Sequence, residues 1–177
     1  CKMIVKKFLE ESGKTFLRAV NTPTVDRSET KYRTVDEALE HADEEYVPGK
    51  YAVTCRQYIG ALLWLLRASR PDIAWSVHRL AKQAHCWTKN SDDDLTRIIQ
   101  YLSETADFVL KEFIDVRYRD NLKVTGYTDS DWAGDSESRK STSGMVIYIT
   151  GPHGTRSIIE YGAKLQTFVA KSSGEAE

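Results

Sequence analysis

The sequence predicts an α+β fold, in which a helical part of the chain is followed by a sheet. Between residues 57 and 102, apolar residues recur at three- and four-residue steps, as they do in amphipathic helices. After Thr105 the pattern changes to short runs of β-branched and aromatic residues separated by Gly, Pro and Asp, which is typical of strands and turns. A meander of strands that runs into a final helix indicates an α+β layer arrangement.

Composition limits the classes of protein to which the chain can belong. With 41% hydrophobic and 29% charged residues, the 177-residue chain can bury a core and is expected to be soluble. The densest apolar run, residues 59–66, is too short to span a bilayer. The first residues lack the pattern of a signal peptide, and three widely spaced cysteines indicate reduced thiols in an intracellular protein. Nothing therefore argues for a membrane or for secretion.

Charge is distributed unevenly along the chain. Residues 26–45 carry eight acidic side chains against three basic ones, which predicts an exposed connector with a short helix near residues 35–42. Residues 49–90 carry seven basic side chains against Asp72 alone. Five aromatic residues interleave with these charges, so the stretch could follow and stack on a nucleic acid. We favour the other interpretation, in which the aromatic residues are core and the charges lie on solvated helix faces. The aromatic residues are Tyr51, Tyr58, Trp64, Trp75 and Trp87.

Three helices are predicted in the middle of the chain. Residues 57–67 are apolar almost all round, which predicts a buried helix. Pro71 interrupts it, and Asp72 is placed to open a second helix with apolar positions between residues 73 and 84. Ser91 is the expected cap of the third helix, which carries an apolar stripe over residues 95–102. These helices would form a compact subdomain.

Five strands are predicted after these helices, at residues 108–110, 124–128, 145–149, 157–161 and 165–169. Turns are expected at Gly134, at residues 151–154 and at Gly162. A last helix is expected to open at Ser172, because Glu175 stands at capping-box spacing. The chain starts at Cys1 and ends within one turn of that helix, so we expect it to be part of a longer protein.

The densest chemical signal is the acidic motif of residues 128–135, TDSDWAGD. Carboxylates that end a strand beside Gly suit hard divalent cations, which prefer oxygen ligands. An EF-hand loop is excluded, because Ala133 and Lys140 occupy positions that need oxygen ligands. An Asp-rich turn that caps backbone N–H groups remains the simpler interpretation for Asp131 and Asp135. His78, His85 and Cys86 lack the second ligand pair of a zinc site.

Asp129 is distinguished from the other aspartates of the motif by a glutamate near the end of the sequence. A carboxylate on the first of three strands and Glu177 in the first turn of the helix after the third can meet around a pair of metal ions. Two metals about 3.5–4 Å apart can activate water and stabilise the leaving oxygen of a phosphodiester displacement.

Three motifs together resemble the ribonuclease H domain of copia-type retrotransposon polyproteins: residues 126–135 (GYTDSDWAGD), 138–144 (SRKSTSG) and 170–177 (AKSSGEAE). Upstream, residues 58–64 (YIGALLW) and 69–74 (SRPDIA) resemble the segment that follows the polymerase core, and residues 21–23 (NTP) resemble a short element before the acidic connector. The resemblance spans nearly the whole chain. It implies the end of the reverse transcriptase region and connector in residues 1–50, a helical connection subdomain in 51–105, and an incomplete ribonuclease H-like mixed sheet in 106–177.

The resemblance implies cleavage of the RNA strand of an RNA–DNA hybrid by two Mg²⁺ ions held by four acidic residues. Asp129 matches the first catalytic aspartate and metal ligand, and Glu177 matches the catalytic glutamate. Asp131 belongs to the motif without being a ligand. Two of the four carboxylates and the Tyr-x-Asp-Asp polymerase motif are absent from this sequence, and Gly174 stands where the family usually has Thr.

Phosphate contacts are expected in the basic segment after the acidic motif, through charge and hydroxyl donors. The alternative for this segment is a turn with a solvated basic pair. The residues concerned are Arg139, Lys140, Ser141, Thr142 and Ser143. The implied partners are the hybrid and the rest of the polyprotein, in intracellular, cytoplasmic particles and without a membrane.

Three functions are compatible with these observations. The first is a ribonuclease H-type nuclease whose isolated segment is inactive, because its set of carboxylates is incomplete. The second is a non-catalytic retroelement remnant that at most binds nucleic acid through its basic middle. A calcium-binding or purely structural domain is the third, and the failed EF-hand pattern disfavours it.

Overall fold

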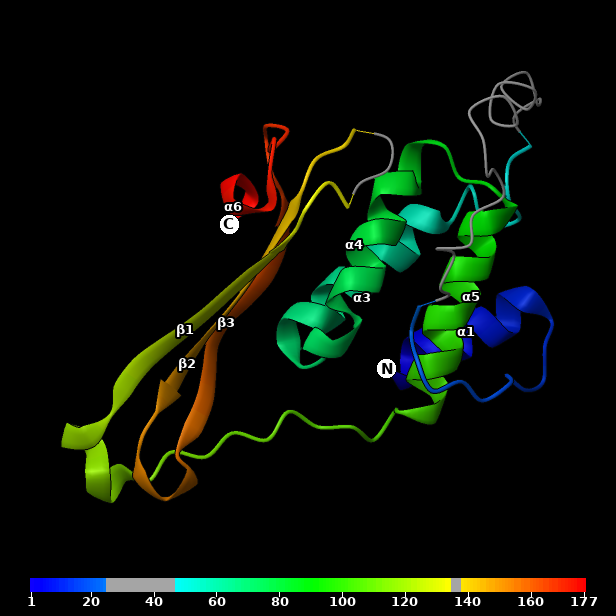
Figure 1. Cartoon of the computed structure of the whole chain (residues 1–177). Helices are drawn as coiled ribbons and strands as arrows, with labels where there is room; N and C mark the ends of the chain where they lie inside the picture. Colours follow the sequence, from blue (N-terminus) through cyan, green and yellow to red (C-terminus); the bar gives the residue numbers. More distant parts are fainter. Residues whose placement is uncertain (25–46, 135–137) are drawn as a thin grey trace. The chain divides into compact units, whose positions relative to one another are not determined.

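The computed structural model describes residues 1–24, 47–134 and 138–177 (Figure 1). It has helices and a three-stranded antiparallel sheet, so the α+β fold class is confirmed. Two compact units divide the chain, unit 1 over Cys1–Phe108 and unit 2 over Val109–Glu177, and each is described by itself. The predicted acidic connector, with its helix near residues 35–42, and Asp135 of the acidic motif lie outside the described residues.

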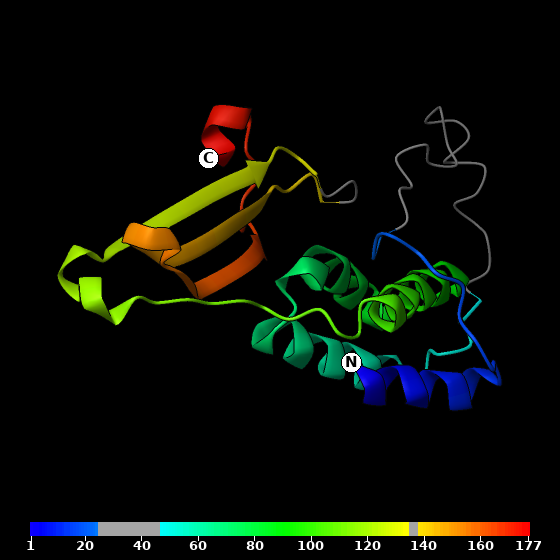
Figure 2. The same cartoon turned by 90° about the horizontal axis from the view of Figure 1, so that it is seen from below.

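Unit 1 is helical (Figure 2). Helix α3 packs on α4, and both α1 and α4 pack on α5. Short 3₁₀ turns at Pro71–Ile73 and Gln83–His85 flank α4. The long helices are α1 (Lys2–Ser12), α3 (Cys55–Ala68), α4 (Ala74–Lys82) and α5 (Lys89–Glu104).

The core of unit 1 is made by one apolar face of each helix. Leu62, Leu80 and Leu95 are fully buried, as are Ile73 and Ile99. The predicted apolar stripe of residues 95–102 is therefore confirmed, with the partners it needs on α3 and α4. The prediction that residues 57–67 are buried all round is wrong, because the opposite face of α3 is exposed.

The aromatic residues of the basic stretch divide into two groups. Tyr51, Tyr58 and Trp87 are buried in the core, as we favoured. Trp64 and Trp75 are 73% and 51% exposed. The sequence could not separate these groups, because both kinds of position recur with helical spacing.

The N-cap of helix α5 is Thr88, three residues before the predicted cap Ser91. The Thr88 hydroxyl accepts from the backbone of Ser91, and the Ser91 hydroxyl accepts from Thr88 N–H at 3.2 Å, which is a capping box. Ser91 thus caps from inside the helix. One residue further, the Asp92 carboxylate accepts from Lys50 N–H at 2.6 Å and from Trp87 Nε1 at 2.6 Å, which fastens the chain before α3 to the start of α5.

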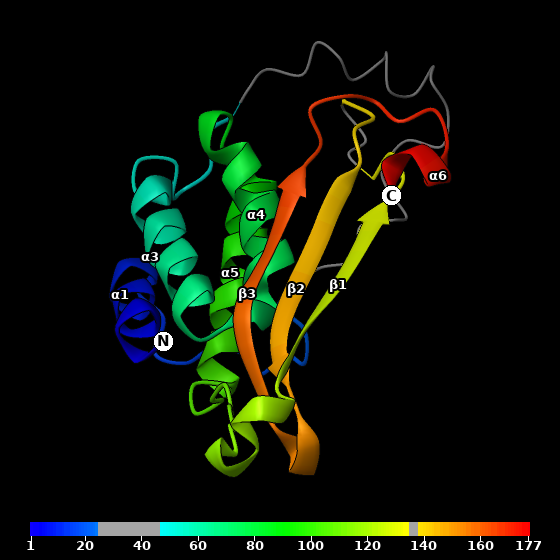
Figure 3. The same cartoon turned by 90° about the vertical axis from the view of Figure 1, so that its left-hand side faces the viewer.

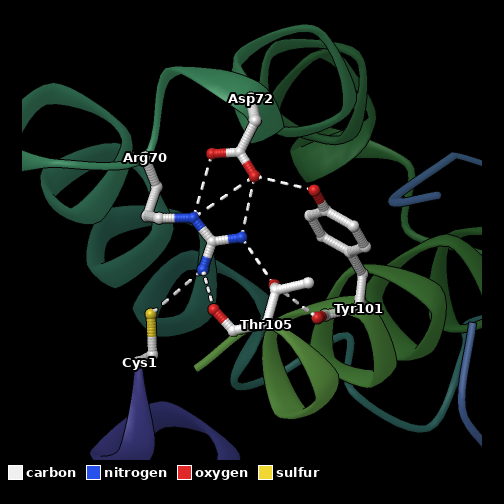
Figure 4. A network of polar contacts seen from close by, with 5 residues as sticks. All are labelled: Cys1, Arg70, Asp72, Tyr101 and Thr105. Carbon is white, nitrogen blue, oxygen red and sulfur yellow. Dashed lines mark hydrogen bonds and ion pairs between the residues drawn. The ribbon is translucent and has the colours of Figure 1, made fainter. Parts of the chain in front are cut away.

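A buried guanidinium joins three segments of unit 1 (Figure 4). Arg70, which follows α3, is 2% exposed. It donates to both carboxylate oxygens of Asp72 at 2.9 and 2.7 Å, and to the carbonyl and hydroxyl of Thr105 at 2.9 and 2.6 Å. A further contact of 3.5 Å reaches Cys1 Sγ, before α1. Tyr101 of α5 completes the set, because its hydroxyl donates to Asp72 at 2.9 Å.

The network shifts the ionisation of Asp72. Partial burial by itself raises the pKa of Asp72, but the hydrogen bonds from Arg70 and Tyr101 and the charge of Arg70 outweigh it and hold the pKa below its ordinary value. Asp72 is therefore ionised in the folded protein at neutral pH, as a buried guanidinium requires of its partner.

Unit 2 is built on a sheet of order β1-β2-β3 (Figure 3). The strands are β1 (Lys123–Asp131), β2 (Thr142–Thr150) and β3 (Arg156–Leu165), preceded by a 3₁₀ segment at Val116–Asn121 and interrupted by another at Pro152–Gly154. The short helix α6 (Ser173–Ala176) follows β3. All three described strands pair antiparallel, so the expected mixed sheet is not what the described residues form.

Two strand predictions were wrong. Residues 108–110 form no strand, and only Phe113 beyond them pairs, in an isolated bridge to Arg156. Gly162 is not a turn, because β3 runs through it opposite Met145 and ends at Leu165, and residues 166–169 form no strand. Backbone pairing with β2 keeps β3 in strand conformation at Gly162.

Unit 2 buries little apolar surface of its own. Among its described residues, the buried apolar side chains are those of Ala170 and Ala176, whereas Val124, Tyr127 and Ile159 are exposed. None of the helices in the described part of the chain is long and apolar enough to cross a membrane.

Replacing Arg70 with Met is expected to lower the free energy of unfolding of unit 1 by about 2–3 kcal/mol, because Asp72 and the Thr105 carbonyl lose their donor. The loss stays below that of a fully enclosed ion pair, since a third of the Asp72 side chain is exposed. Urea unfolding followed by circular dichroism at the helix band measures it. The control Arg18→Met removes an exposed arginine and is expected to change stability by less than about 0.5 kcal/mol; equal effects of both variants would contradict the role of the network.

The lowered pKa of Asp72 predicts a dependence of stability on pH. The folded state holds this carboxylate ionised more strongly than the unfolded chain does, so its contribution is present above about pH 4 and is lost as pH falls through the lowered pKa. Thermal unfolding between pH 3 and 7 is expected to show a smaller acid-side loss for Asp72→Asn than for the wild type. Parallel pH profiles for the two proteins would refute this assignment.

Candidate metal site at the end of the sheet

Asp129 lies near the end of β1, opposite Gly144 of β2. Its side chain is exposed, and its Oδ1 accepts from the N–H of Ser130 at 2.9 Å. Because side chains alternate along a strand, Asp129 shares a face of the sheet with Tyr127, and Ser130 points to the opposite face. The carboxylate is thus open to solvent and available to a cation.

Asp131 has a different environment from Asp129. Its carboxylate accepts from the N–H of Thr142 in a very short hydrogen bond across the β1–β2 pair. It also lies against Gly134, where an added Cβ would collide with Asp131 Oδ2. The carboxylate is therefore engaged in the turn after β1, and only a glycine leaves room for it there. This geometry agrees with the interpretation of Asp131 as a turn residue.

The predicted phosphate-contact segment lies between this turn and β2. Arg139 is exposed with a left-handed backbone (φ 57°), and Lys140 is half-buried. Thr142 and Ser143 are half-buried in β2. Ser141 corrects the prediction: it is fully buried, and its hydroxyl accepts from Ala133 N–H at 3.1 Å, so it stabilises the turn and offers no surface to a phosphate.

Helix α6 is held at the end of β1 by several hydrogen bonds. The Ser172 hydroxyl accepts from Glu175 N–H at 3.2 Å, which confirms the predicted cap, although the Glu175 carboxylate accepts from Lys171 N–H rather than from the capping residue. Trp132, in the turn after β1, donates through Nε1 to the Ala170 carbonyl at 3.1 Å. Figure 3 shows the resulting position of α6 beside the end of β1.

The far end of α6 is tied to the sheet through Gln166. Its amide nitrogen donates to the Ala176 carbonyl at 2.6 Å and to the Ser143 hydroxyl at 2.8 Å. Glu177, which is exposed, comes directly after this carbonyl. Trp132 and Gln166 were not predicted from the sequence as site residues, because their role consists of contacts between segments distant in the chain.

The structure therefore places α6, which Glu177 directly follows, beside β1, which carries Asp129, and both carboxylates are exposed. Their oxygen donors suit a hard divalent cation such as Mg²⁺. Two carboxylates make an incomplete set, and across the described residues no group of three or more His, Cys, Asp or Glu side chains is arranged to hold a metal ion.

Comparison with known proteins shows the family of the chain. It is 34% identical over 122 residues to the retrovirus-related Pol polyprotein from transposon RE2 of Arabidopsis thaliana, an alignment that covers 69% of this chain. The Pol polyprotein from transposon RE1 of the same plant is 35% identical over 122 residues, also 69% of this chain. The secreted RxLR effector protein 161 of Plasmopara viticola is 36% identical over 119 residues, which are 67% of this chain and 78% of the effector. This chain belongs to the family of copia-type retrovirus-related Pol polyproteins.

Membership of the Pol family is confirmed, as the resemblance predicted, but it concerns a small segment of the plant proteins. The alignments span 8% of the length of each of the two transposon Pol polyproteins. No family model matches the chain. No solved structure matches it either.

Replacing Gln166 with Ala is expected to loosen α6, because four residues cannot sustain a helix without tertiary support. The Cα chemical shifts of residues 173–176 should move toward random-coil values while those of β1 and β2 remain. The control is Thr167→Ala, an exposed neighbour, which should leave α6 unchanged. Helical shifts that persist in the Gln166 variant would mean that Ser172 and Trp132 suffice.

Proposed function

We propose that this Pol-family chain contributes the first part of a ribonuclease H-type nuclease domain that cleaves the RNA strand of RNA–DNA hybrids. The observation that carries the proposal is the adjacency of β1, which bears Asp129, and α6, which Glu177 directly follows; these two carboxylates match the family's catalytic motif. The order of three antiparallel strands followed by a helix supports a ribonuclease H-like fold for this unit. The whole polyproteins are far longer than this chain, so their other activities are not assigned to it.

In the proposed site Asp129 and Glu177 serve as metal ligands. Mg²⁺ bound there would activate water and stabilise the leaving oxygen of the scissile phosphodiester. The chain's own contribution is to hold Asp129 at a fixed position of β1, through the register with Gly144, and to fix α6 through Gln166 and Trp132. Asp131 maintains the turn and does not bind the metal.

The hybrid is proposed to approach along the turn between β1 and β2. Arg139 is exposed there, next to Lys140, and both can pair with phosphate oxygens. Thr142 and Ser143 come next, at the start of β2, although the Ser143 hydroxyl already accepts from Gln166. The other proposed partner is the remainder of the polyprotein.

The isolated chain is proposed to be inactive, because two carboxylates hold a metal ion weakly and repel one another without it. This is also the observation that favours the second candidate, a non-catalytic retroelement protein that binds nucleic acid. We place the chain in intracellular particles with the polyprotein, whereas one relative of similar length is named a secreted effector.

Asp129→Asn is expected to abolish hybrid cleavage in a protein that extends through all four carboxylates, with a loss of at least about 100-fold, because the amide binds Mg²⁺ poorly. Hydrolysis of a labelled RNA–DNA hybrid measures it. Asp120→Asn is the matched control: it makes the same chemical change in the segment before β1 and should leave the rate unaltered. A fully active Asp129 variant would exclude the assignment.

The 177-residue chain itself allows a second readout of the same substitution. Mn²⁺ should broaden the amide resonances around Asp129 and Glu177 at millimolar concentrations, and Asp129→Asn should remove this broadening while Asp120→Asn preserves it. Broadening centred elsewhere would place the cation site in another part of the chain.

A further inference from the structure

Helix α3 presents one solvated face that contains a tryptophan. The residues at positions 56, 60, 64 and 67 are spaced by four, four and three, so they lie on one side of the helix, and all four are exposed. We call this surface the Trp64 face, made of Arg56, Gly60, Trp64 and Arg67. The opposite side of α3, with Tyr58, Leu62 and Leu65, lies in the core of unit 1.

Trp64 is the most exposed tryptophan of the basic stretch, at 73%. Its neighbours in sequence, Leu65 and Leu66, are buried in the core of unit 1, whereas the Trp64 side chain faces solvent. An indole on the surface presents a flat π-face with which another planar group can stack.

Gly60 lies one turn from Trp64 and has no packing role in the described structure. A Cβ at this position would meet no atom within 4 Å, and the backbone does not require glycine. A glycine in a helix interior lowers helix stability relative to alanine. Its effect here is to leave bare backbone beside the indole, where another molecule can approach closely.

The charge of this face has one sign. Arg56 and Arg67 flank the indole, and α3 contains no acidic residue. The two arginines are eleven positions apart, which places them about 16 Å apart along the helix axis. Cations on both sides of an exposed aromatic ring are the arrangement that binds a single strand, since bases stack on the ring and phosphates pair with the cations.

We propose that the Trp64 face binds single-stranded nucleic acid, with a base stacked on Trp64 and phosphates paired with Arg56 and Arg67. Gly60 leaves the space in which the strand lies beside the indole. This site is separate from Asp129 and Glu177, needs no metal ion and lies within unit 1. It extends the proposed nuclease function by giving the chain a way to hold an unpaired strand.

Trp75 of α4 is a matched internal control. It is also an exposed tryptophan in a helix without acidic residues, but the guanidinium of Arg79 already lies over its ring at 5.3 Å. Pro23 and Asp94 also line the small cavity beside it. A base cannot occupy the ring face that Arg79 covers, so Trp75 should contribute little to binding.

The test is fluorescence anisotropy of a labelled oligothymidylate of about 12 nucleotides with the 177-residue chain in EDTA at low salt. Trp64→Ala is expected to weaken binding at least about fivefold, and Trp64→Phe to retain most of it because a ring remains. Arg56→Gln with Arg67→Gln should reduce the log–log salt slope by about 1.4. Trp75→Ala and Arg18→Gln should bind as the wild type does, and circular dichroism verifies that each variant is folded.

Wild-type affinity in a folded Trp64→Ala variant would overturn the proposal, as would the absence of measurable binding by the unaltered chain. Equal losses in the Trp64 and Trp75 variants would also overturn it, since the surface would then lack the specificity assigned to it. Asp129→Asn should not change this binding. A failure of the nuclease proposal is therefore distinguishable from a failure of this one.

Discussion

The buried guanidinium of Arg70 is the interaction on which the helical unit depends. A guanidinium removed from water is costly unless hydrogen-bond acceptors, preferably a carboxylate, surround it. The partners that satisfy it come from the turn after α3, from the end of α5 and from the start of the chain. One side chain thus links these three segments, and its hydrogen bonds hold the end of α3 beside the end of α5.

The two units are stabilised in different ways. Unit 1 buries one apolar face from each of four helices, and its polar contacts orient a core that exists already. Unit 2 relies on the backbone pairing of three strands and on a few side-chain bonds from Trp132 and Gln166. Its candidate site lies on exposed carboxylates at the end of that sheet. Unit 2, which carries the candidate site, therefore has fewer buried apolar side chains than unit 1. This agrees with the need of functional groups to remain accessible.

Local patterns predicted much of this structure. The apolar stripe of residues 95–102, the middle of each strand and the Ser172 cap all depend on neighbours a few residues away, so the sequence was sufficient. The start of α5 was misplaced because Ser91 bonds back to Thr88, and two serine or threonine positions compete for the same cap. Gly162 was misread as a turn because strand pairing overrides a local preference. At the candidate site, Asp129 and Glu177 came from motif resemblance, whereas the support from Gln166 could not be foreseen, since it joins segments through tertiary contacts.

The start of unit 2 has a consequence for proteolysis. Residues 109–112 belong to no helix or strand, and Lys111 among them is exposed. A protease needs about this much extended, unpaired backbone to bind its substrate, and here neither unit has to open to provide it. Trypsin can therefore cut after Lys111 without first unfolding a helix or a strand.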